Sequence, residues 1–565
     1  MKLIDHWFWS AFSEHRRIYY RVFLAAALVN FFAVASTIFI MVVYDRVIPN
    51  SAYESLYALT IGMAIVLIFD FVLKMLRAYF IDYAGEYVDK RIGDSIFDRL
   101  LEAPTAVVTG PVGATANTFR EFDQVREFFT SATLSLVVDL PFIFFFIFVI
   151  YLIAGPLAIV PLVAVPVVIG VGLAIQPFLS KVSEEAGTHN QEKQSILVET
   201  ISGIESIKVL GGGDLVKNRW RDSATKQSSV SRISRSLAQI AVNTAQSSQQ
   251  ICLVGIVFYG VFLVSDGTVS MGAMVAAVLL SSRTLAPLGQ IAGLAGRANN
   301  ARTAYQRLSA FMEETKESSK TKRDEGAIRR SKLGTLEFVD VKYRYPDKEV
   351  DTLRDMKLKI NEGEKVAILG RNGSGKSTLV KLACGLFTSS DGIVSYDGMD
   401  INQIHSEDIS KFIGIVLQDV QLFSGSVKEN ITMGRTDISE EDIVRAGKIS
   451  GVEEFIGKMP GGYDLVLSDR GMGLSGGQRQ AIAIARAIVC KPTHYILDEP
   501  TSAMDMNSEQ AFITQFNQTL SESTLVVVSH RMPLLNLVSR IIVMNEGKVV
   551  DDGPREEILN KLRTQ

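Results

Sequence analysis

The chain has 565 residues, too many for a single hydrophobic core, so two or more domains are expected. A net charge of −3 gives no sign of a nucleic-acid partner, and three scattered cysteines argue against a disulfide framework or a zinc site. Hydrophobic residues make up 47% of the chain and the mean hydropathy is +0.21; this excess lies before residue 300 and predicts membrane spans.

The first twenty residues mix aromatic and basic side chains, among them Trp7, Trp9, Arg16 and Arg17. This mixture suits the membrane interface and predicts an amphipathic elbow helix over residues 1–20, lying along the cytoplasmic surface. A cleavable signal peptide does not fit, because the apolar run that follows is too long and lacks a small-residue cleavage site.

Residues 21–312 are predicted to form an all-α transmembrane domain with six spans. The first apolar run, Arg21–Val43, would be about 34 Å long as a helix, enough to cross a hydrocarbon core of about 30 Å. Similar runs follow at Leu56–Tyr79, Leu134–Ala154, Pro156–Leu179, Gln249–Val264 and Met271–Gly289. Basic residues concentrate after the second and fourth runs, so these stretches and both termini are expected to be cytoplasmic.

Two of the basic stretches, Tyr83–Leu101 and Val182–Leu210, have helical patterns, so the spans are expected to continue well beyond the membrane. Breaks at Ala103-Pro104, Gly110-Pro111 and Gly211-Gly212-Gly213 would mark the far ends of helical hairpins, where a soluble domain could dock. An ordinary surface turn is the alternative at each break.

Two acidic residues lie inside the apolar runs. Asp70 stands four residues before Lys74, so a pair along one helix face is expected. Asp139 precedes Pro141 and leaves two alternatives open: a functional charge that faces protein or water, or a cap near the edge of the bilayer.

Residues 313–332 carry almost no apolar side chain and predict a solvated linker. From residue 333 to residue 565 strands alternate with helices, which indicates an α/β domain. Within it, the apolar strand Lys365–Leu369 leads into a glycine-rich loop and then a helical run, the context that a phosphate-binding P-loop requires.

In such a loop the backbone amides and the helix N-terminus converge on phosphate oxygens. Lys376 would reach the β- and γ-phosphates, and the Ser377 hydroxyl would ligate Mg²⁺. The predicted phosphate-binding residues are Gly370, Asn372, Gly373, Ser374, Gly375, Lys376, Ser377 and Thr378. The alternative is a glycine-rich turn without function.

A second apolar strand, Tyr495–Leu497, ends in two carboxylates. Asp498 could supply the hard oxygen ligand that a phosphate-bound Mg²⁺ needs, directly or through water. Glu499 follows, where it could polarise the attacking water as general base. The alternative is an acidic strand end that faces solvent.

The pentapeptide Leu474–Gln478 (LSGGQ), together with Gln418, Asp505 and His530, closely resembles the signature of ATP-binding cassette (ABC) proteins over residues 333–565. The resemblance implies that Tyr345 stacks on adenine. It also implies that Gln418 senses Mg²⁺ and the attacking water and that His530 contacts the γ-phosphate.

It further implies that Ser475 and Gly477 bind ATP held by the opposite cassette; Gln478 and Asp505 are counted with them as nucleotide-binding residues. One chain carries each half of this arrangement once, so a homodimer is expected. Three residues depart from the commonest family pattern without removing a catalytic group: Leu417, His494 and Met504.

Six spans ahead of one cassette resemble a half-size ABC exporter. Four motifs in the membrane half look like those of bacterial type I protein-secretion ATPases, the exporters of RTX adhesins and haemolysin-type proteins: Tyr44–Pro49, Phe119–Phe122, Phe128–Ser131 and Asp139–Pro141. Many members carry an N-terminal peptidase-like domain, and because this chain enters the membrane almost at once, peptide cleavage by it is not expected.

This resemblance implies a Gram-negative inner-membrane protein with a cytoplasmic cassette, surrounded by lipid, which binds no nucleic acid. A periplasmic adaptor and an outer-membrane channel would be its partners, and an unfolded protein with a C-terminal signal its substrate. A lipid or drug exporter, or an ATP-gated channel, would use the same parts. A soluble ABC protein has no use for six spans, and a kinase or GTPase does not need the LSGGQ motif.

Overall fold

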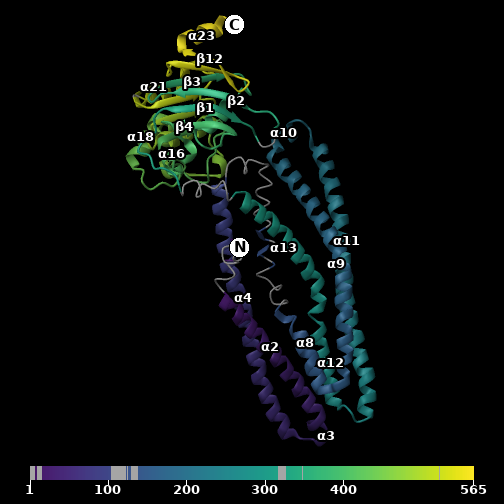
Figure 1. Cartoon of the computed structure of the whole chain (residues 1–565). Helices are drawn as coiled ribbons and strands as arrows, with labels where there is room; N and C mark the ends of the chain where they lie inside the picture. The colour runs from purple at the N-terminus through teal and green to yellow at the C-terminus, as the bar shows by residue number, and fades with distance from the viewer. Residues whose placement is uncertain are drawn as a thin grey trace. The chain divides into compact units, whose positions relative to one another are not determined.

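The computed structural model describes residues 7–8, 10, 16–103, 122–123, 125–126, 128, 138–315, 326–345, 348–520 and 522–564. The chain divides into two compact units, with the main boundary between Glu314 and Thr315. We call the first the helical unit and the second, which contains the described strands, the sheet unit (Figure 1).

The described part of the helical unit consists mainly of long helices. Its described helices are α2 (Arg16–Val42), α3 (Ile48–Asn50), α4 (Tyr53–Glu102), α8 (Phe142–Ala154), α9 (Ile159–Ser202), α10 (Ile204–Val209), α11 (Gly213–Ser265), α12 (Met271–Leu285) and α13 (Leu288–Glu314), with a π-helical turn at Val43–Val47 and a 3-10 turn at Gly155–Ala158. Among the described residues, four stretches are long and apolar enough to cross a membrane: Arg16–Asn50, Tyr53–Glu102, Phe142–Ser202 and Gly213–Ser265. The shorter α12 is also apolar.

The third of these stretches holds two of the predicted spans. Gly155 has a φ of +49° and Pro156 follows it, so α8 ends there and α9 begins as a separate helix. The described helix α8 starts at Phe142, after a turn at Leu140–Pro141, and residues 134–137 of the predicted span lie outside the described residues. The count of six crossings stays a prediction.

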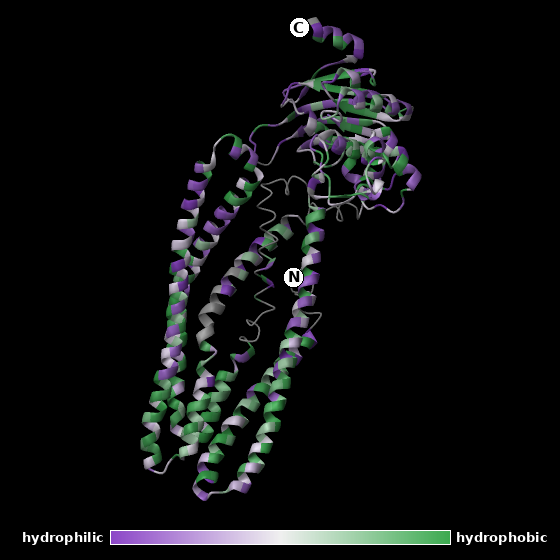
Figure 2. Cartoon of the chain, turned by 180° about the vertical axis from the view of Figure 1, so that it is seen from behind, coloured by the Kyte–Doolittle hydropathy of each residue, from purple (hydrophilic) through white to green (hydrophobic). Residues whose placement is uncertain are grey.

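The predicted helical extensions are confirmed, since α4 continues to Glu102 and α9 with α10 continues to Val209. The chain then turns at Gly211–Gly212, and α11 packs beside α9 (Figure 1). Figure 2 shows hydrophobic residues gathered at one end of the helical unit and hydrophilic residues along the far part of the α9–α11 hairpin. The tip of this hairpin still exposes Val209 (85%) and Leu210 (81%). The other predicted break, from Pro104 to Pro111, lies outside the described residues.

Most of the predicted elbow helix also lies outside the described residues, and Arg16 onward belongs to α2. Phe8 is described and is buried in a cluster with Ile92 of α4 and Leu308 of α13. Trp7 stacks on Tyr305 with ring centroids 6.1 Å apart. Aromatic packing therefore anchors Trp7 and Phe8 beside α4 and α13.

Polar side chains tie the apolar helices together. The expected pair is confirmed, because Lys74 Nζ lies 2.5 Å from Asp70 Oδ2 on the same helix. Asp139 accepts hydrogen bonds from Arg77 Nη1 at 2.9 and 3.2 Å and from Asn30 Nδ2 at 3.3 Å. Its carboxylate thus faces protein and joins α2 and α4 to the start of α8.

A second polar tie joins the end of α2 to the start of α12. Asp45 accepts hydrogen bonds from Ser270 Oγ at 2.6 Å and from Gly272 N at 2.7 Å, so it caps the N-terminus of α12. A Cβ on Gly272 would collide with Asp45 and with the Met41 carbonyl. Only glycine permits this close approach.

The described strands of the sheet unit form three sheets. The largest has the order β12-β11-β3-β10-β9-β6, and all neighbours are parallel except β11 and β12. A four-stranded antiparallel sheet has the order β2-β1-β4-β5, and β7 pairs with β8. The strands are β1 (Leu336–Tyr343), β2 (Leu353–Ile360), β3 (Lys365–Gly370), β4 (Asp391–Tyr396), β5 (Met399–Asp400), β6 (Ile413–Val416), β7 (Gly425–Ser426), β8 (Val466–Leu467), β9 (His494–Asp498), β10 (Thr524–Val528), β11 (Arg540–Asn545) and β12 (Lys548–Pro554).

The central strands are apolar on both sides because each side covers a different core. In β3, Ala367 and Leu369 pack into the core that includes α20 and α21, while Val366 and Ile368 pack into the core that includes α15 and the smaller sheet. The helices of this unit are α15 (Lys376–Ala383), α16 (Ser406–Phe412), α17 (Val427–Thr432), α18 (Glu440–Ser450), α19 (Val452–Ile456), α20 (Gly476–Ile488), α21 (Met506–Thr519), α22 (Met532–Leu535) and α23 (Arg555–Thr564), with 3-10 turns at Ile401–Gln403, Gly462–Asp464 and Asp469–Gly471.

The described end of the predicted linker is part of the sheet unit. Ile328 forms a parallel β-bridge with Ile404. Arg329 pairs with Glu407 at 2.7 Å, and Arg330 pairs with Asp397 at 2.8 Å. The charges that made residues 313–332 look solvated therefore bind partners on the sheet unit at this end.

Candidate nucleotide site

The P-loop runs from the end of β3 into α15, as the sequence predicts. Gly373 and Gly375 have φ values of +84° and +99°, which favour glycine. A Cβ on Gly375 would also lie 2.7 Å from the Leu353 side chain. The loop can therefore curl around its own N–H groups at the start of α15, where a phosphate would be held.

Lys376 lies inside this loop, where its Nζ donates to the carbonyls of Gly370 at 2.7 Å and Arg371 at 3.0 Å. Burial lowers the pKa of Lys376, and the negative charges of Asp498 and Glu499 oppose that shift. The same loop that would bind the phosphates thus holds the ammonium group of Lys376 in place.

Asp498 ends β9 as a buried carboxylate. Burial raises its pKa, and a hydrogen bond from the Ser377 side chain acts in the opposite direction. Ser377 and Asp498, two of the three predicted Mg²⁺-binding residues, are thus brought together by the first turn of α15 and the end of β9, and the third is Gln418.

Glu499 occupies a strained backbone conformation with a φ of +49°. Its N–H donates to Val528 O at 2.8 Å, and its Oε2 accepts from Ser529 Oγ at 3.3 Å. The carboxylate of the predicted base is therefore held beside the end of β10, one residue past Asp498.

The sheet register brings the remaining catalytic candidates to the same edge. Gln418 follows β6 by two residues, and His530 follows β10 by two residues. Because β3, β10, β9 and β6 are parallel neighbours, their carboxyl ends meet at one edge, which also carries the P-loop and Asp498. Gln418 and His530 are both exposed there.

Tyr345 lies beside the P-loop helix. Its hydroxyl is 3.1 Å from Thr378 Oγ1, and its ring contacts Tyr343 and Phe387 edge-on at 5.1 and 5.7 Å. The half-buried ring is thus fixed near the phosphate loop, as a base-stacking role would require.

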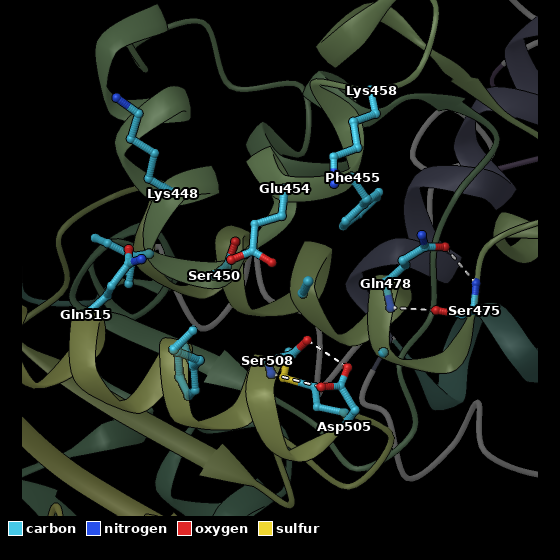
Figure 3. Close-up of a pocket in the computed structure, with 17 residues that line it drawn as sticks. Lys448, Ser450, Glu454, Phe455, Lys458, Ser475, Gln478, Asp505, Ser508 and Gln515 are labelled. Atoms are coloured by element: carbon cyan, nitrogen blue, oxygen red, sulfur yellow. Dashed lines mark hydrogen bonds between the residues drawn. The ribbon is translucent and has the colours of Figure 1, made fainter.

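The signature residues line a separate pocket of about 300 Å³, whose lining includes none of residues 370–378. Ser475 and Gln478 form a capping box at the start of α20, with bonds of 3.2 and 2.9 Å (Figure 3). Asp505 caps α21, accepting from the Asn507 and Ser508 amides at 3.0 Å each, and these bonds lower its pKa. Gly477 lies on the same wall.

The residues at the sheet edge suit a nucleoside triphosphate. Ser374 Oγ is buried and has no hydrogen-bond partner among the described residues, as expected of a group that serves a ligand. Within the described ranges no group of three or more His, Cys, Asp or Glu side chains surrounds a metal position. A cation here would depend on Asp498, Ser377, Gln418 and the phosphates themselves.

Sequence reasoning missed two residues that hold the catalytic segment. Gln480 on α20 and Arg531 after β10 both bond to the backbone between Glu499 and Met504. Gln480 could have been noticed as a polar side chain on the buried face of an amphipathic helix. Arg531 gives no such signal, since its position depends on the fold.

His494, which differs from the commonest residue of the family pattern, makes structural contacts that explain its presence. His494 Nε2 lies 2.7 Å from the Gly334 carbonyl, and Nδ1 lies 3.0 Å from Thr493 Oγ1. Tyr396 meets the ring edge-on at 5.3 Å. The imidazole joins the large sheet to the segment that precedes β1.

Comparison with known families matches residues 20–288 to the ABC transporter transmembrane region and residues 353–502 to the ABC transporter family. The chain is 33% identical over 555 residues to the toxin RTX-I translocation ATP-binding protein of Actinobacillus pleuropneumoniae, covering 98% of this chain and 78% of that protein. It belongs to the ABC transporter family. This ABC transporter is a membrane-bound ATPase of the exporter group that contains the type I secretion ATPases.

Other relatives agree with this assignment. The leukotoxin translocation ATP-binding protein LktB of Mannheimia glucosida is 32% identical over 556 residues, with 98% of this chain and 78% of the relative covered. A solved structure of a bacterial Atm1-family ABC exporter with ATP bound superposes with a TM-score of 0.82 over 97% of this chain and 96% of the other, at 19% identity. The exporter fold predicted from the sequence, with a transmembrane helical domain followed by an α/β cassette, is confirmed.

Proposed function

We propose that this ABC transporter works as a homodimer in the inner membrane of a Gram-negative bacterium and exports a large unfolded polypeptide of the RTX toxin or adhesin kind. The observation that carries the proposal is the 33% identity, over 98% of the chain, to a protein named for RTX toxin translocation. The substrate would carry an uncleaved C-terminal signal. A periplasmic adaptor and an outer-membrane channel would complete the path.

The residues gathered at the sheet edge are suited to bind ATP. The P-loop amides and Lys376 would hold the phosphates, and the fixed ring of Tyr345 would stack on adenine. Ser377 and Asp498, with Gln418, would hold a Mg²⁺ ion, which when bound neutralises charge on the phosphates.

Hydrolysis requires a proton acceptor near the γ-phosphate. Glu499 is one residue past Asp498 and is held by Ser529, so its carboxylate would take a proton from the attacking water. His530 ends the neighbouring strand at the same edge and would contact the γ-phosphate. Gln418 follows β6, on the side of β9 away from β10, and its side chain would contact the attacking water.

A second chain would complete each ATP site. The pocket at Ser475, Gly477, Gln478 and Asp505 lies at the N-terminus of α20, whose dipole suits an anion, yet it is lined by no P-loop residue of its own chain. In a dimer, each of these pockets would receive ATP held by the partner. ATP bound at this seam would favour the closed dimer, and hydrolysis would remove that preference.

The coupling to the membrane would use the tips of the long helices. Val209 and Leu210 are exposed at the α9–α11 tip, and apolar side chains of this kind suit a docking contact with a cassette. Movement of the cassettes would then pass along α9 and α11 into the apolar part of the helical unit.

Glu499→Gln tests the catalytic half of the proposal. The amide keeps the size of the side chain but cannot accept the proton, so ATP hydrolysis should fall about 100-fold or more. ATP should still bind, and the dimer should persist by size-exclusion chromatography. Normal turnover in this variant would refute the assignment of the base.

Substrate class is tested separately with the purified wild-type transporter. A C-terminal RTX fragment is expected to change the ATPase rate, whereas the same fragment with its C-terminal signal removed should not. Stimulation by lipid alone would instead favour a lipid exporter, and uncoupled ion current in a planar bilayer would favour a channel.

A further inference from the structure

Gln480 connects the signature helix to the catalytic segment of the same chain. It is 4% exposed and lies on α20, less than one turn after Gly477. Its Nε2 donates to Glu499 O at 3.2 Å and to Ser502 Oγ at 2.7 Å, and its Oε1 accepts from Ala503 N at 2.8 Å. Three of the four hydrogen bonds open to a glutamine amide are therefore made to one short segment.

That segment needs such support. Glu499 has a φ of +49°, and a strained non-glycine residue persists only where its surroundings hold it. The Glu499 N–H is fixed by Val528 O at 2.8 Å, and its carbonyl is fixed by Gln480. The two bonds set the peptide groups on both sides of the predicted base.

The far side of the segment is held independently. Arg531 Nη2 donates to Ser502 O at 3.0 Å, and Nη1 donates to Met504 O at 3.3 Å and to Glu509 Oε2 at 3.1 Å. Glu509 is buried and also bonds Thr501 at 2.5 Å. Because Arg531 fixes this side, a displacement of Gln480 would act mainly on the side that carries Glu499.

We propose that Gln480 is a positioning residue that sets the backbone of Glu499 from the signature helix of the same chain, and thereby links the two ATP sites of the dimer. The inference rests on the proposed function for the dimer itself. In that dimer, Ser475 and Gly477 meet the nucleotide of the partner, whereas Glu499 serves the nucleotide of its own chain. Closure on one nucleotide would then order the base at the other.

Mixed dimers separate this role from a general weakening of the signature motif. Each dimer carries Glu499→Gln in one chain, so that only one base remains, and Gln480→Ala is placed either in the chain with intact Glu499 or in the other chain. Single-turnover cleavage of ATP is measured, because one round needs only one working site.

With Gln480→Ala in the chain that keeps Glu499, cleavage should fall between about tenfold and 100-fold below the parent mixed dimer. With the substitution in the other chain, the rate should stay within about twofold of the parent. The reverse pattern would mean that Gln480 acts through the signature pocket, and equal rates in all three dimers would mean that it positions nothing; either result overturns the proposal.

Two further variants guard against a folding defect. Ser502→Ala lies on an exposed loop and removes one of the three bonds, so in the homodimer kcat should fall about threefold with KM for ATP unchanged. Gln510→Ala, an exposed glutamine on α21, is the matched control and should leave kcat unchanged. Unchanged kcat in both Ser502→Ala and Gln480→Ala homodimers would refute the inference. Normal hydrolysis by the Glu499→Gln homodimer would instead refute the catalytic assignment on which it rests.

Discussion

The polar side chains of the candidate site gather at one edge of the large sheet, whereas the polar side chains that join the apolar helices of the helical unit lie far apart. Lys376 follows β3, whereas Asp498 and Glu499 stand at the end of β9. Both strands pair in parallel with β10, so the fold alone brings the three residues to one edge. Asp139 instead meets Arg77 and Asn30 from helices that are 62 and 109 residues away in sequence. The charged residues of the sheet unit lie together where a nucleotide would bind. In the helical unit, a single charged residue such as Asp139 joins two apolar helices.

The difference has a physical origin. Lys376 and Asp498 are buried at the sheet edge, but the loop carbonyls hold Lys376 and a bond from Ser377 holds Asp498, so both charges are satisfied where a ligand would bind. Between apolar helices, an unpaired charge is costly, so each one must be satisfied by protein. Removing a charge should therefore reduce ligand affinity in the sheet unit and reduce stability in the helical unit.

The largest effect is expected for Lys376→Ala. Loss of the charged donor to the phosphates should weaken ATP binding by about 3 kcal/mol, or roughly 100-fold, while the melting temperature without nucleotide changes little. Binding of a fluorescent ATP analogue measures the first, and thermal unfolding the second. Unchanged affinity would contradict the P-loop assignment.

In the helical unit, Arg77→Ala should destabilise by about 2 kcal/mol without changing ATP affinity. The side chains of Arg77 and Asp139 are 19% and 26% exposed, so the cost is lower than for a fully buried pair. Thermal unfolding in detergent measures the change. The double variant with Asp139→Asn removes the stranded charge and should recover part of the loss; a double variant less stable than the single one would contradict the pairing.

The order of strand, loop and helix at the sheet edge could be predicted because the motifs there are short and the strands are apolar on both faces. The P-loop, the end of β9 and the LSGGQ capping box each form from residues within a few positions of one another. The partners of Asp139, the anchored end of the linker and the bonds of Gln480 could not be predicted, because their partners come from distant parts of the chain. Asp70 was the exception in the helical unit, since its partner Lys74 is one helical turn away.

A smaller, pH-dependent effect is expected at His494. Burial lowers the pKa of His494, against opposing contributions from its bond to Gly334 and the charges of Glu362 and Asp397. The unfolded chain therefore binds the proton first, and stability should fall by up to about 1.4 kcal/mol per pH unit as the pH drops below about 6.5, until the lowered folded-state pKa is reached.

His494→Gln retains a donor for Gly334 O but does not titrate. Its unfolding temperature should therefore depend less on pH than that of the wild type between about pH 7.5 and 5.5. Parallel pH profiles for the two proteins would show that the imidazole is not responsible.

The smallest effect is expected for Lys74→Ala. The pair with Asp70 lies along one helix, and the lysine side chain is 49% exposed, so its loss should cost less than about 0.5 kcal/mol. Thermal unfolding beside Arg77→Ala gives the comparison directly. A loss as large as that of Arg77→Ala would mean that exposure does not distinguish the two pairs.

The contact of Asp45 with the start of α12 has a consequence for how the membrane helices can move. A carboxylate seated on the free amides of a helix end needs no counter-ion, and its bond to Gly272 leaves no room for a side chain between the two backbones. The C-terminal end of α2 and the N-terminal end of α12 are thus held together at this corner. Rearrangements of the helical unit would then swing the opposite ends of these helices and leave the corner intact.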